Sequence, residues 1–219
     1  MNNLETISIL LEVQYLAPVQ YYSKFLKYDK ILIEQKEHYS KGSFRNRCQI
    51  TMSDGIHGLS IPLSKGKNQQ TDIREVRIDY SQNWQQTHFR SIKTAYGSAP
   101  FYEYYEPYLA VFYEKKTEFL FDFCLDMQQQ ICKLLKIKPS IDFTETYITD
   151  YTESAVLDFR NKICPRNYAN STYSDPHFSP ARYPQIFEER QGFIPNLSIL
   201  DLLFCTGPEA QSYLRQSNK

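Results

Sequence analysis

The fold is decided by the opening stretch Thr6-Ile-Ser-Ile-Leu-Leu-Glu-Val13, which is followed by a segment from Pro18 to Leu26 and by the run Lys30-Ile-Leu-Ile33. The two short apolar runs, rich in β-branched residues, predict buried strands. Pro18 suits the first turn of a helix, where its missing N–H is not needed, and apolar residues follow it at helical spacing. Strands joined through a helix pair in parallel, so this stretch predicts a β-α-β unit.

The rest of the chain predicts a hairpin and helices around that unit. Apolar and polar residues alternate on both sides of the turn Ser53-Asp54-Gly55, which is typical of a β-hairpin. A short strand is expected at Val76 to Ile78. Helical periodicity then follows in three segments, which run from Asn83 to before Pro100, from Glu103 to Tyr113, and from a cap at Thr117 to near Pro139.

We therefore expect a single α/β domain over residues 1–215, with a mixed sheet opened by the β-α-β unit and flanked by helices. Residues 150–185 have little periodicity and several prolines, asparagines and serines, so we expect a lid or an irregular insertion there. A flexible tail is expected at residues 216–219.

The charge balance excludes some partners. Lysines and arginines number 25, as do aspartates and glutamates, so no global positive field attracts nucleic acid or an anionic membrane. No run of about 18 apolar residues predicts a membrane span, and the apolar run at Ile7 to Leu11 lacks the flanks of a signal peptide. The sequence does not indicate a particular cofactor or oligomeric state.

The five cysteines stand singly along the chain, at Cys48, Cys124, Cys132, Cys164 and Cys205. An odd count argues against a disulfide framework, and no paired spacing is typical of a metal site, so we expect no metal. Reduced thiols are the simplest interpretation, and they indicate a cytoplasmic location.

The strongest candidate for a functional site is the stretch Glu34 to Ile50, where charged and polar residues crowd between two apolar runs. Parallel strands gather ligands at their carboxyl ends, which places Gln14 and Tyr15 after the first strand and Glu34 after the second at one edge. Rigid scaffolds commonly display binding groups on such connections.

Within this stretch we expect substrate binding by Arg47 and Asn46, with Lys41, Ser43 and Tyr39 close by. An arginine fork and its neighbouring donors suit a phosphate, a pyrophosphate or a carboxylate. The Lys41-Gly42-Ser43 sequence is not a P-loop, because the glycine-rich run and the following helix are missing.

A structural role for Arg47 is an equally simple interpretation. Its guanidinium would then pair with a carboxylate of the same stretch, Glu34 or Glu37, and hold the connection closed. Gln14 and Tyr15 carry an amide and a phenol that suit the hydroxyls of a sugar, while their alternative is a local bond within a turn.

Three residues are candidates for catalysis. His88 and His38 are candidate general bases, since imidazole suits proton transfer near neutral pH. His88 lies on the apolar side of its predicted helix, between Trp84 and Ile92, which also fits a hydrogen-bonded core histidine. Glu34 is a base if it is desolvated, and otherwise the partner of Arg47.

Several phrases occur in an ordered set along nearly the whole chain. They are Gln14-Tyr15-Leu16-Ala17-Pro18 with Tyr21-Tyr22, Tyr39 to Arg47, Leu59-Ser60-Ile61-Pro62, Asn83-Trp84 with His88 and Tyr96, Ala99-Pro100-Phe101-Tyr102, and Phe193 to Phe204 before Gly207-Pro208. In this set the chain resembles the WbqC-like protein family, bacterial proteins found with surface-polysaccharide and O-antigen biosynthesis.

The resemblance implies an enzyme that transfers an acyl, amino or related group to a nucleotide-linked sugar, so the expected partner is a small-molecule substrate such as a nucleotide sugar. The alternative is a non-catalytic binding or assembly protein in the same pathway. The chain departs from the family at Val13, where family members usually show a histidine, and in the alanine inserted before Pro18. Residues 150–185 also lack the extra segment of longer members, so functions of that histidine or segment are not carried over.

Overall fold

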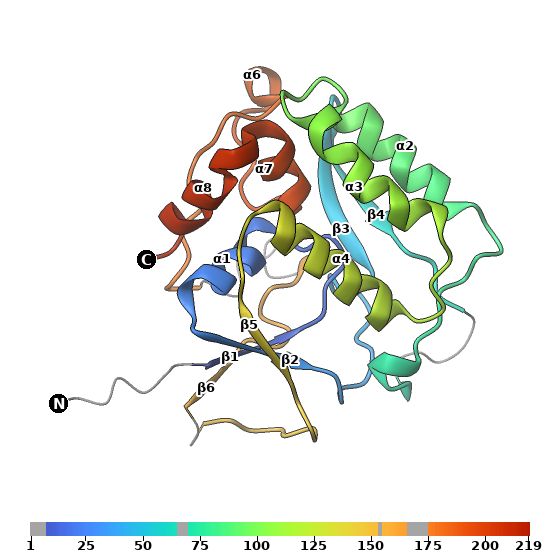
Figure 1. Ribbon diagram of the computed structural model, residues 1–219, viewed down its shortest axis with the longest axis vertical. Helices are drawn as coiled ribbons and strands as arrows, with labels where there is room; N and C mark the ends of the chain where they lie inside the picture. The colour runs from blue at the N-terminus through green and yellow to red at the C-terminus, as the bar shows by residue number, and fades with distance from the viewer. Residues whose placement is uncertain (1–7, 65–69, 153–154, 166–174) are drawn as a thin grey trace.

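A four-stranded parallel sheet lies at one end of the molecule, with most helices above it in the view of Figure 1. The structure, a computed structural model, describes residues 8–64, 70–152, 155–165 and 175–219. Within these ranges the sheet has the order β5-β2-β1-β6 and all of its neighbouring strands are parallel. The strands are β1 (Ser8–Glu12), β2 (Lys30–Glu34), β5 (Ser140–Phe143) and β6 (Val156–Asp158).

The predicted β-α-β unit is confirmed. Helix α1 (Val19–Lys27) connects β1 to β2, and the two strands pair in parallel. Side chains alternate between the faces of a strand, so Ile9 and Leu11 on β1 enter the hydrophobic core together with Ile31 and Ile33 on β2. The opening stretch therefore builds the centre of the sheet.

The predicted hairpin is also present. Strands β3 (Arg47–Met52) and β4 (Gly55–Ser60) pair antiparallel around the turn at residues 53–54. The α/β class with parallel strands, a hairpin and flanking helices is thus confirmed, but the parallel and antiparallel strands form two separate sheets where one mixed sheet is predicted.

Eight helical elements complete the described part of the chain besides α1. They are η2 (Ile73–Glu75), α2 (Trp84–Tyr96), α3 (Tyr102–Glu114), α4 (Leu120–Leu134), α6 (Glu188–Gln191), α7 (Ile199–Thr206), η3 (Gly207–Glu209) and α8 (Ala210–Gln216). The three central helices match the three predicted helical segments, apart from the cap of α4, which is Phe119 and not Thr117.

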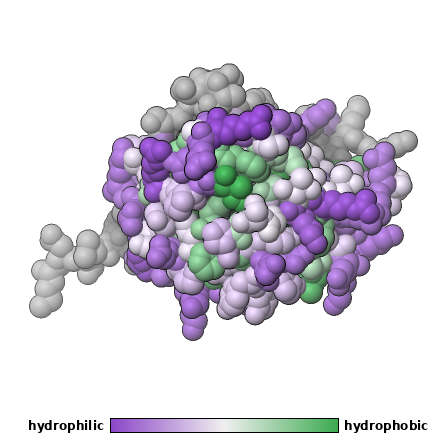
Figure 2. All heavy atoms as spheres, turned by 90° about the horizontal axis from the view of Figure 1, so that it is seen from above, coloured by the Kyte–Doolittle hydropathy of each residue, from purple (hydrophilic) through white to green (hydrophobic). Residues whose placement is uncertain are grey.

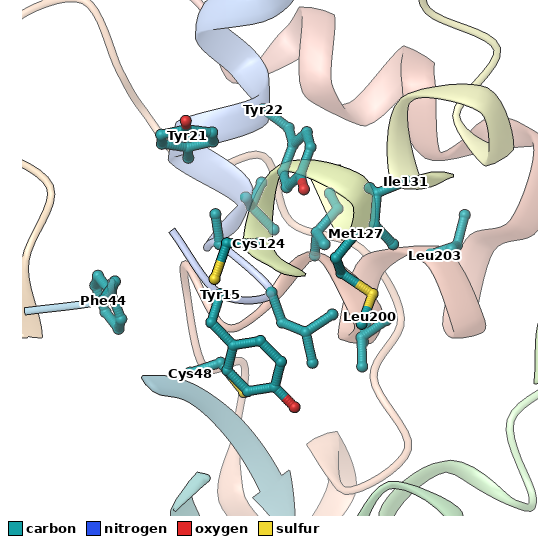
Figure 3. Packing of buried hydrophobic residues seen from close by; sticks show 14 of the residues in the cluster. Tyr15, Tyr21, Tyr22, Phe44, Cys48, Cys124, Met127, Ile131, Leu200 and Leu203 are labelled. Atoms are coloured by element: carbon teal, nitrogen blue, oxygen red, sulfur yellow. The ribbon is translucent and has the colours of Figure 1, made fainter. Parts of the chain in front are cut away.

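Helix α4 supplies much of the core. Its Cys124, Met127 and Ile131 lie on one apolar stripe, between the tyrosines of α1 and the leucines of α7 in Figure 3. Helix α7 is buried on all sides, which fits a short helix without a polar face. The core therefore joins segments from both ends of the chain.

The start of α1 and the start of α7 form a seam. The Val19 N–H donates to the Leu197 carbonyl at 3.0 Å, and the Ile199 N–H donates to the Ala17 carbonyl at 2.9 Å. Ser198 caps α7, and its hydroxyl also donates to the Leu16 carbonyl at 2.9 Å. The first N–H group of each helix has no partner within its own helix, and it is thus bonded to a carbonyl just before the other helix.

Three expected features take another form. Strand β6 lies within 150–185, where a lid or irregular insertion is expected, although residues 153–154 and 166–174 lie outside the described ranges. Val76 to Ile78 forms single bridges next to η2 in place of a strand. At 216–219, Asn218 bridges Phe178 and its amide donates to the Ser23 carbonyl, so the tail is anchored where a flexible one is expected.

The surface is largely polar, in line with a mean hydropathy of −0.53. Figure 2 shows one face, on which apolar side chains gather in the middle with polar ones around them. Of the helices that the structure describes, none has the length and apolar character needed to cross a bilayer. The five cysteines are free thiols.

Gly207 is required where α7 meets η3. Its φ is +54°, a left-handed conformation that side chains disfavour, and a Cβ atom at this position would lie 2.4 Å from the ring of Phe101. The Phe101 N–H donates to the Phe204 carbonyl at 3.0 Å, which holds the ring in this place. Two phrases of the sequence, around Phe101 and around Gly207, therefore meet at close range.

We expect Gly207→Ala to lower the free energy of unfolding by at least about 2 kcal/mol, because it adds backbone strain to a steric clash. Urea denaturation measures this change. Gly58→Ala is the matched control, since a Cβ there would meet nothing closer than 4.0 Å and its cost should be small. Equal effects of the two substitutions would contradict this account of Gly207.

Candidate functional site

Acidic residues end three of the four parallel strands. Glu12 and Glu34 are register partners at the ends of β1 and β2 and are fully buried, and Asp158 ends β6. Together with Glu37, Arg45 and Arg160 they form what we call the carboxyl-edge cluster. It lies where ligands bind in many open parallel sheets.

Arg45 is the central cation of this cluster. The side chain is fully buried, and it donates from Nε and Nη2 to the two oxygens of Glu37 at 2.7 and 2.5 Å. Its Nη1 donates to Asn161 Oδ1 at 3.0 Å and lies 3.9 Å from Glu12 Oε1. A fork of this geometry suits a carboxylate, so Arg45 holds the loop after β2 against the ends of β1 and β6.

Arg160 is the second cation. It donates to Glu34 Oε2 at 2.9 Å and to Asp158 Oδ2 at 2.6 Å. Its guanidinium carbon also lies 4.7 Å from the ring centroid of Tyr147 and 5.3 Å from that of Tyr151, within the range of cation–π attraction. Arg160 therefore links the ends of β2 and β6 beneath two tyrosines.

Carboxylates outnumber guanidiniums in the cluster, with Glu12, Glu34, Glu37 and Asp158 facing Arg45 and Arg160. The pKa of Glu37 is raised to about 7, chiefly by burial, with the lowering effect of Arg45 opposed by the charges of Glu12 and Glu34. Only part of the unfavourable burial of Glu37 is therefore offset by its pairing with Arg45.

The neighbouring oxygens of Glu12 and Glu34 are engaged by internal donors. Gln14 Nε2 donates to Glu12 Oε1 at 2.9 Å and to the Ile163 carbonyl at 2.9 Å, while its own Oε1 is buried with no hydrogen-bond partner among the described residues. Thr144 Oγ1 donates to Glu34 Oε1 at 2.6 Å. The expected sugar-binding amide of Gln14 is therefore partly committed to the cluster.

Arg47 is the expected anion anchor, and its alternative structural role requires an ion pair with Glu34 or Glu37. It pairs with neither of them. Arg160 pairs with Glu34 and Arg45 pairs with Glu37. Arg47 is half-buried, and its Nε is buried with no hydrogen-bond partner in the part of the chain that the structure describes. A buried donor without a partner inside the chain is uncommon in proteins, and its hydrogen-bonding capacity is left for a water molecule or a ligand atom.

The expected neighbours of Arg47 divide into two groups. Asn46 is buried and joins the loop to the hairpin, because its Oδ1 accepts from Tyr39 Oη at 2.8 Å and its Nδ2 donates to the Ile61 carbonyl at 2.9 Å. Ser43 is buried and donates to the Ser40 carbonyl at 2.6 Å. Lys41 and His38, by contrast, are exposed.

His88 and Tyr15 come together in the core. Tyr15 is fully buried, and its Oη lies 3.0 Å from His88 Nδ1 and 2.7 Å from Tyr113 Oη. Burial lowers the pKa of His88 to about 4, although a bond to a backbone group of Ser60 raises it in part. The ring is therefore neutral, and it packs against Trp84 as a hydrogen-bonded core histidine would.

The backbone beside this group is strained. Leu16, directly after Tyr15, has a φ of +42°, which is unusual for a branched residue and costs about 1 kcal/mol or more. Its carbonyl accepts from Ser198 in the α1–α7 seam. The seam thus holds in place the strand exit at which Gln14 and Tyr15 lie.

Arg45 and Arg160, which anchor the cluster, do not stand out in the sequence. Arg45 lies two residues before Arg47 in the same phrase, and residue types alone do not tell which of the two is buried. Arg160 lies in the segment without periodicity. A signal was present in the acidic residues that follow apolar runs at Glu12, Glu34 and Asp158, since buried carboxylates require cations.

The geometry defines an α/β protein with a parallel sheet and a separate hairpin, a buried charge cluster at the carboxyl ends of the parallel strands, and beside it an arginine whose Nε has no partner among the described residues. The model of the WbqC-like protein family matches residues 13–213, so the chain belongs to this family. Within the described ranges, no group of three or more His, Cys, Asp or Glu side chains is arranged so that it could hold a metal ion.

A relative of the chain is the uncharacterized protein Rv1507c of Mycobacterium tuberculosis. The two are 28% identical over 205 residues, which cover 85% of this chain and 88% of that protein. No solved structure matches the chain.

We expect Arg45→Met to lower the free energy of unfolding by about 3–5 kcal/mol, because it leaves buried carboxylates without their cation. The double variant Arg45→Met with Glu37→Gln should recover part of this loss, since it also removes one of those charges. Urea denaturation of both variants measures the effect, with Arg90→Met on the exposed side of α2 as the control. A loss below about 1 kcal/mol would rule out a bracing role for Arg45.

We expect His88 to make stability depend on pH. The unfolded chain binds a proton at His88 near pH 6.5 and the folded chain near pH 4, so the contribution of the neutral ring is complete above pH 6.5 and is lost as the pH falls toward 4. The stability difference between the wild type and His88→Gln should therefore shrink by up to about 3 kcal/mol over this window.

Denaturation at a series of pH values between 4 and 7.5 measures this difference. Comparing the two proteins at each pH cancels the opposite contributions of Glu37 and Asp201, whose pKa values are raised by burial. A difference that stays constant with pH would show that His88 has the same pKa in the folded and unfolded chains.

Proposed function

We propose that this protein is a cytoplasmic enzyme of bacterial surface-polysaccharide biosynthesis of the O-antigen type, which transfers an acyl, amino or related group to a nucleotide-linked sugar. The observation that carries the proposal is Arg47, whose Nε is buried without a hydrogen-bond partner among the described residues. Membership of the WbqC-like family supports the pathway, and the carboxyl edge of the parallel sheet supports the place.

In this proposal Arg47 binds a phosphate of the nucleotide sugar, because a guanidinium fork suits phosphate oxygens. The exposed ammonium of Lys41 adds positive charge on the same loop. Tyr39 and Asn46 position Arg47 through their mutual hydrogen bond, and Ser43 holds the loop. Gln14 offers its unpartnered Oε1 to a sugar hydroxyl.

For the proton transfer we favour His38 over His88. His38 is exposed on the loop between Glu37 and Tyr39, whereas His88 is buried and bonded to Tyr15. Glu34 has both carboxylate oxygens engaged, so its role is electrostatic. Tyr15 shapes the strand exit from within the core.

A non-catalytic binding or assembly role in the same pathway is the second candidate. It is favoured by the internal pairing of Arg45 and Arg160, whose main donors are used by protein acceptors. This alternative predicts that a nucleotide sugar binds without being converted. The enzyme predicts that product forms when a suitable donor is also present.

We expect nucleotide sugars to raise the melting temperature of the wild type, since a ligand at about 100 times its Kd stabilises the folded state by ~2.7 kcal/mol. Arg47→Ala should weaken binding by about 10- to 100-fold, because it removes a charge-assisted hydrogen bond. Titration calorimetry with the compound that gives the largest thermal shift measures the affinity.

Arg47→Lys is the informative companion variant, since it keeps the charge but not the fork and should bind with intermediate affinity. Arg90→Ala removes an exposed arginine elsewhere and should bind like the wild type. If Arg47→Ala bound normally and only lost stability, Arg47 would be a structural residue and the proposed site would be lost.

A further inference from the structure

A groove between α3 and α4 lies outside the site proposed above. It has a cavity volume of about 620 Å³, within the ~300–1,000 Å³ that is typical of small-molecule sites. Figure 1 shows α3 and α4 side by side, with the end of α7 near them. None of the residues that line the groove belongs to the carboxyl-edge cluster or to the loop of Arg47.

One wall of the groove is aromatic and preformed. Tyr105 is buried, and Phe101 is held against Gly207 with no room for a Cβ atom between them. Pro208 continues this wall, and Leu134 lines the groove from α4. A ligand therefore meets a rigid apolar surface and does not have to order it first.

Two further tyrosines are exposed at the groove. Tyr104 and Tyr108 lie one turn apart on α3, with 64% and 47% of their surface exposed and their ring centroids 6.4 Å apart. Large aromatic side chains at this exposure offer their ring faces to a flat ligand. A nucleobase has the shape and the polarisable face that such rings bind.

Cations from α4 complete the groove. Lys133 and Lys136 line it and are both exposed, and none of the described residues that line it is acidic. Both lie near the carboxyl end of α4, where the helix dipole favours cations and not anions. The two ammonium groups nonetheless leave this part of the groove with charge for an anionic ligand.

Lys136 has a conformation that glycine would adopt more easily. Its φ is +56°, and it follows Leu135, the C-cap of α4. Here the Ile137 N–H donates to the Cys132 carbonyl at 2.9 Å and the Lys136 N–H to the Lys133 carbonyl at 3.0 Å. This pair of bonds is the Schellman motif, which favours glycine at the left-handed position. The lysine is therefore not explained by the stability of the helix end.

We propose that the groove binds a nucleoside diphosphate, with its base against Tyr104 and Tyr108 and its diphosphate beside Lys133 and Lys136. The flat aromatic faces and the cations lie in one cavity of suitable volume, and this combination matches a ring joined to a compact anion. The proposal does not depend on the function proposed for the carboxyl edge, because the two sites share no residue.

Titration calorimetry of the full chain with four probes tests the proposal. The probes are uridine diphosphate and adenosine diphosphate, uridine for the ring alone and inorganic pyrophosphate for the charge alone. At least one diphosphate should bind more tightly than both partial probes, and its affinity should fall as the salt concentration rises.

Lys136→Gly is the decisive variant. It should bind the diphosphate about 10-fold more weakly or worse, because it removes one charge-assisted contact. Its melting temperature should stay equal or rise, because glycine relieves the left-handed strain. Lys138→Ala removes an exposed lysine two residues further on, outside the groove, and should change neither property.

Tyrosine variants test the stacking separately. Tyr104→Ala should weaken diphosphate binding, whereas Tyr104→Phe keeps the ring and should bind as the wild type does. If the wild type, Tyr104→Ala and Tyr104→Phe bound the diphosphate equally well, stacking of the base on Tyr104 would be ruled out.

Three results would overturn the proposed site. They are no binding of either diphosphate, unchanged affinity in Lys136→Gly, and a lower melting temperature of that variant, which would make Lys136 a structural residue. Diphosphate binding that is lost in Arg47→Ala but kept in Lys136→Gly would assign the ligand to the carboxyl edge. If the diphosphate bound with two affinities, and Arg47→Ala and Lys136→Gly each abolished a different one, the protein would have two sites.

Discussion

The structure depends on the compensation of buried carboxylates at one edge of a parallel sheet. In-register pairing of β1 with β2 places Glu12 beside Glu34, and Asp158 follows at the end of β6. Such charges are unfavourable in a core unless cations and hydrogen-bond donors reach them. Arg45 arrives from the loop before the hairpin and Arg160 from the chain after β6, so the requirement for charge balance links three distant parts of the chain to one edge.

The same edge is held from above by the seam between α1 and α7. Backbone bonds at Val19 and Ile199, with the Ser198 hydroxyl on the Leu16 carbonyl, close the exit of β1. The Tyr15 N–H then donates to the Phe44 carbonyl at 2.9 Å, which connects this exit to the loop that carries Arg45 and Arg47. Three of the phrases in which the chain resembles its family therefore meet in space, namely Gln14 to Pro18, Tyr39 to Arg47 and Phe193 to Phe204.

This arrangement separates residues that brace from residues that face outward. Arg45, Asn46 and His88 are buried and bonded to protein partners, whereas Arg47 retains an unpartnered Nε among the described residues. The groove of α3 and α4 shows the same separation, since Phe101 and Tyr105 form a packed wall while Tyr104 and the two lysines are exposed. Functional hypotheses follow from the outward group, because these side chains are exposed or, in Arg47, carry a buried donor without a partner among the described residues.

The sequence by itself determined the β-α-β unit, the hairpin and the three long helices, because apolar periodicity is local and survives in any environment. Strand β6 was not predictable, since three residues in an aperiodic segment become a strand through pairing with β1 alone. The sequence also placed Gln14, Glu34 and the loop to Arg47 at one edge. Tertiary structure decided that Arg45 and not Arg47 is the buried ion-pair partner, and that His88 bonds to Tyr15, because such choices depend on which distant atoms meet inside the core.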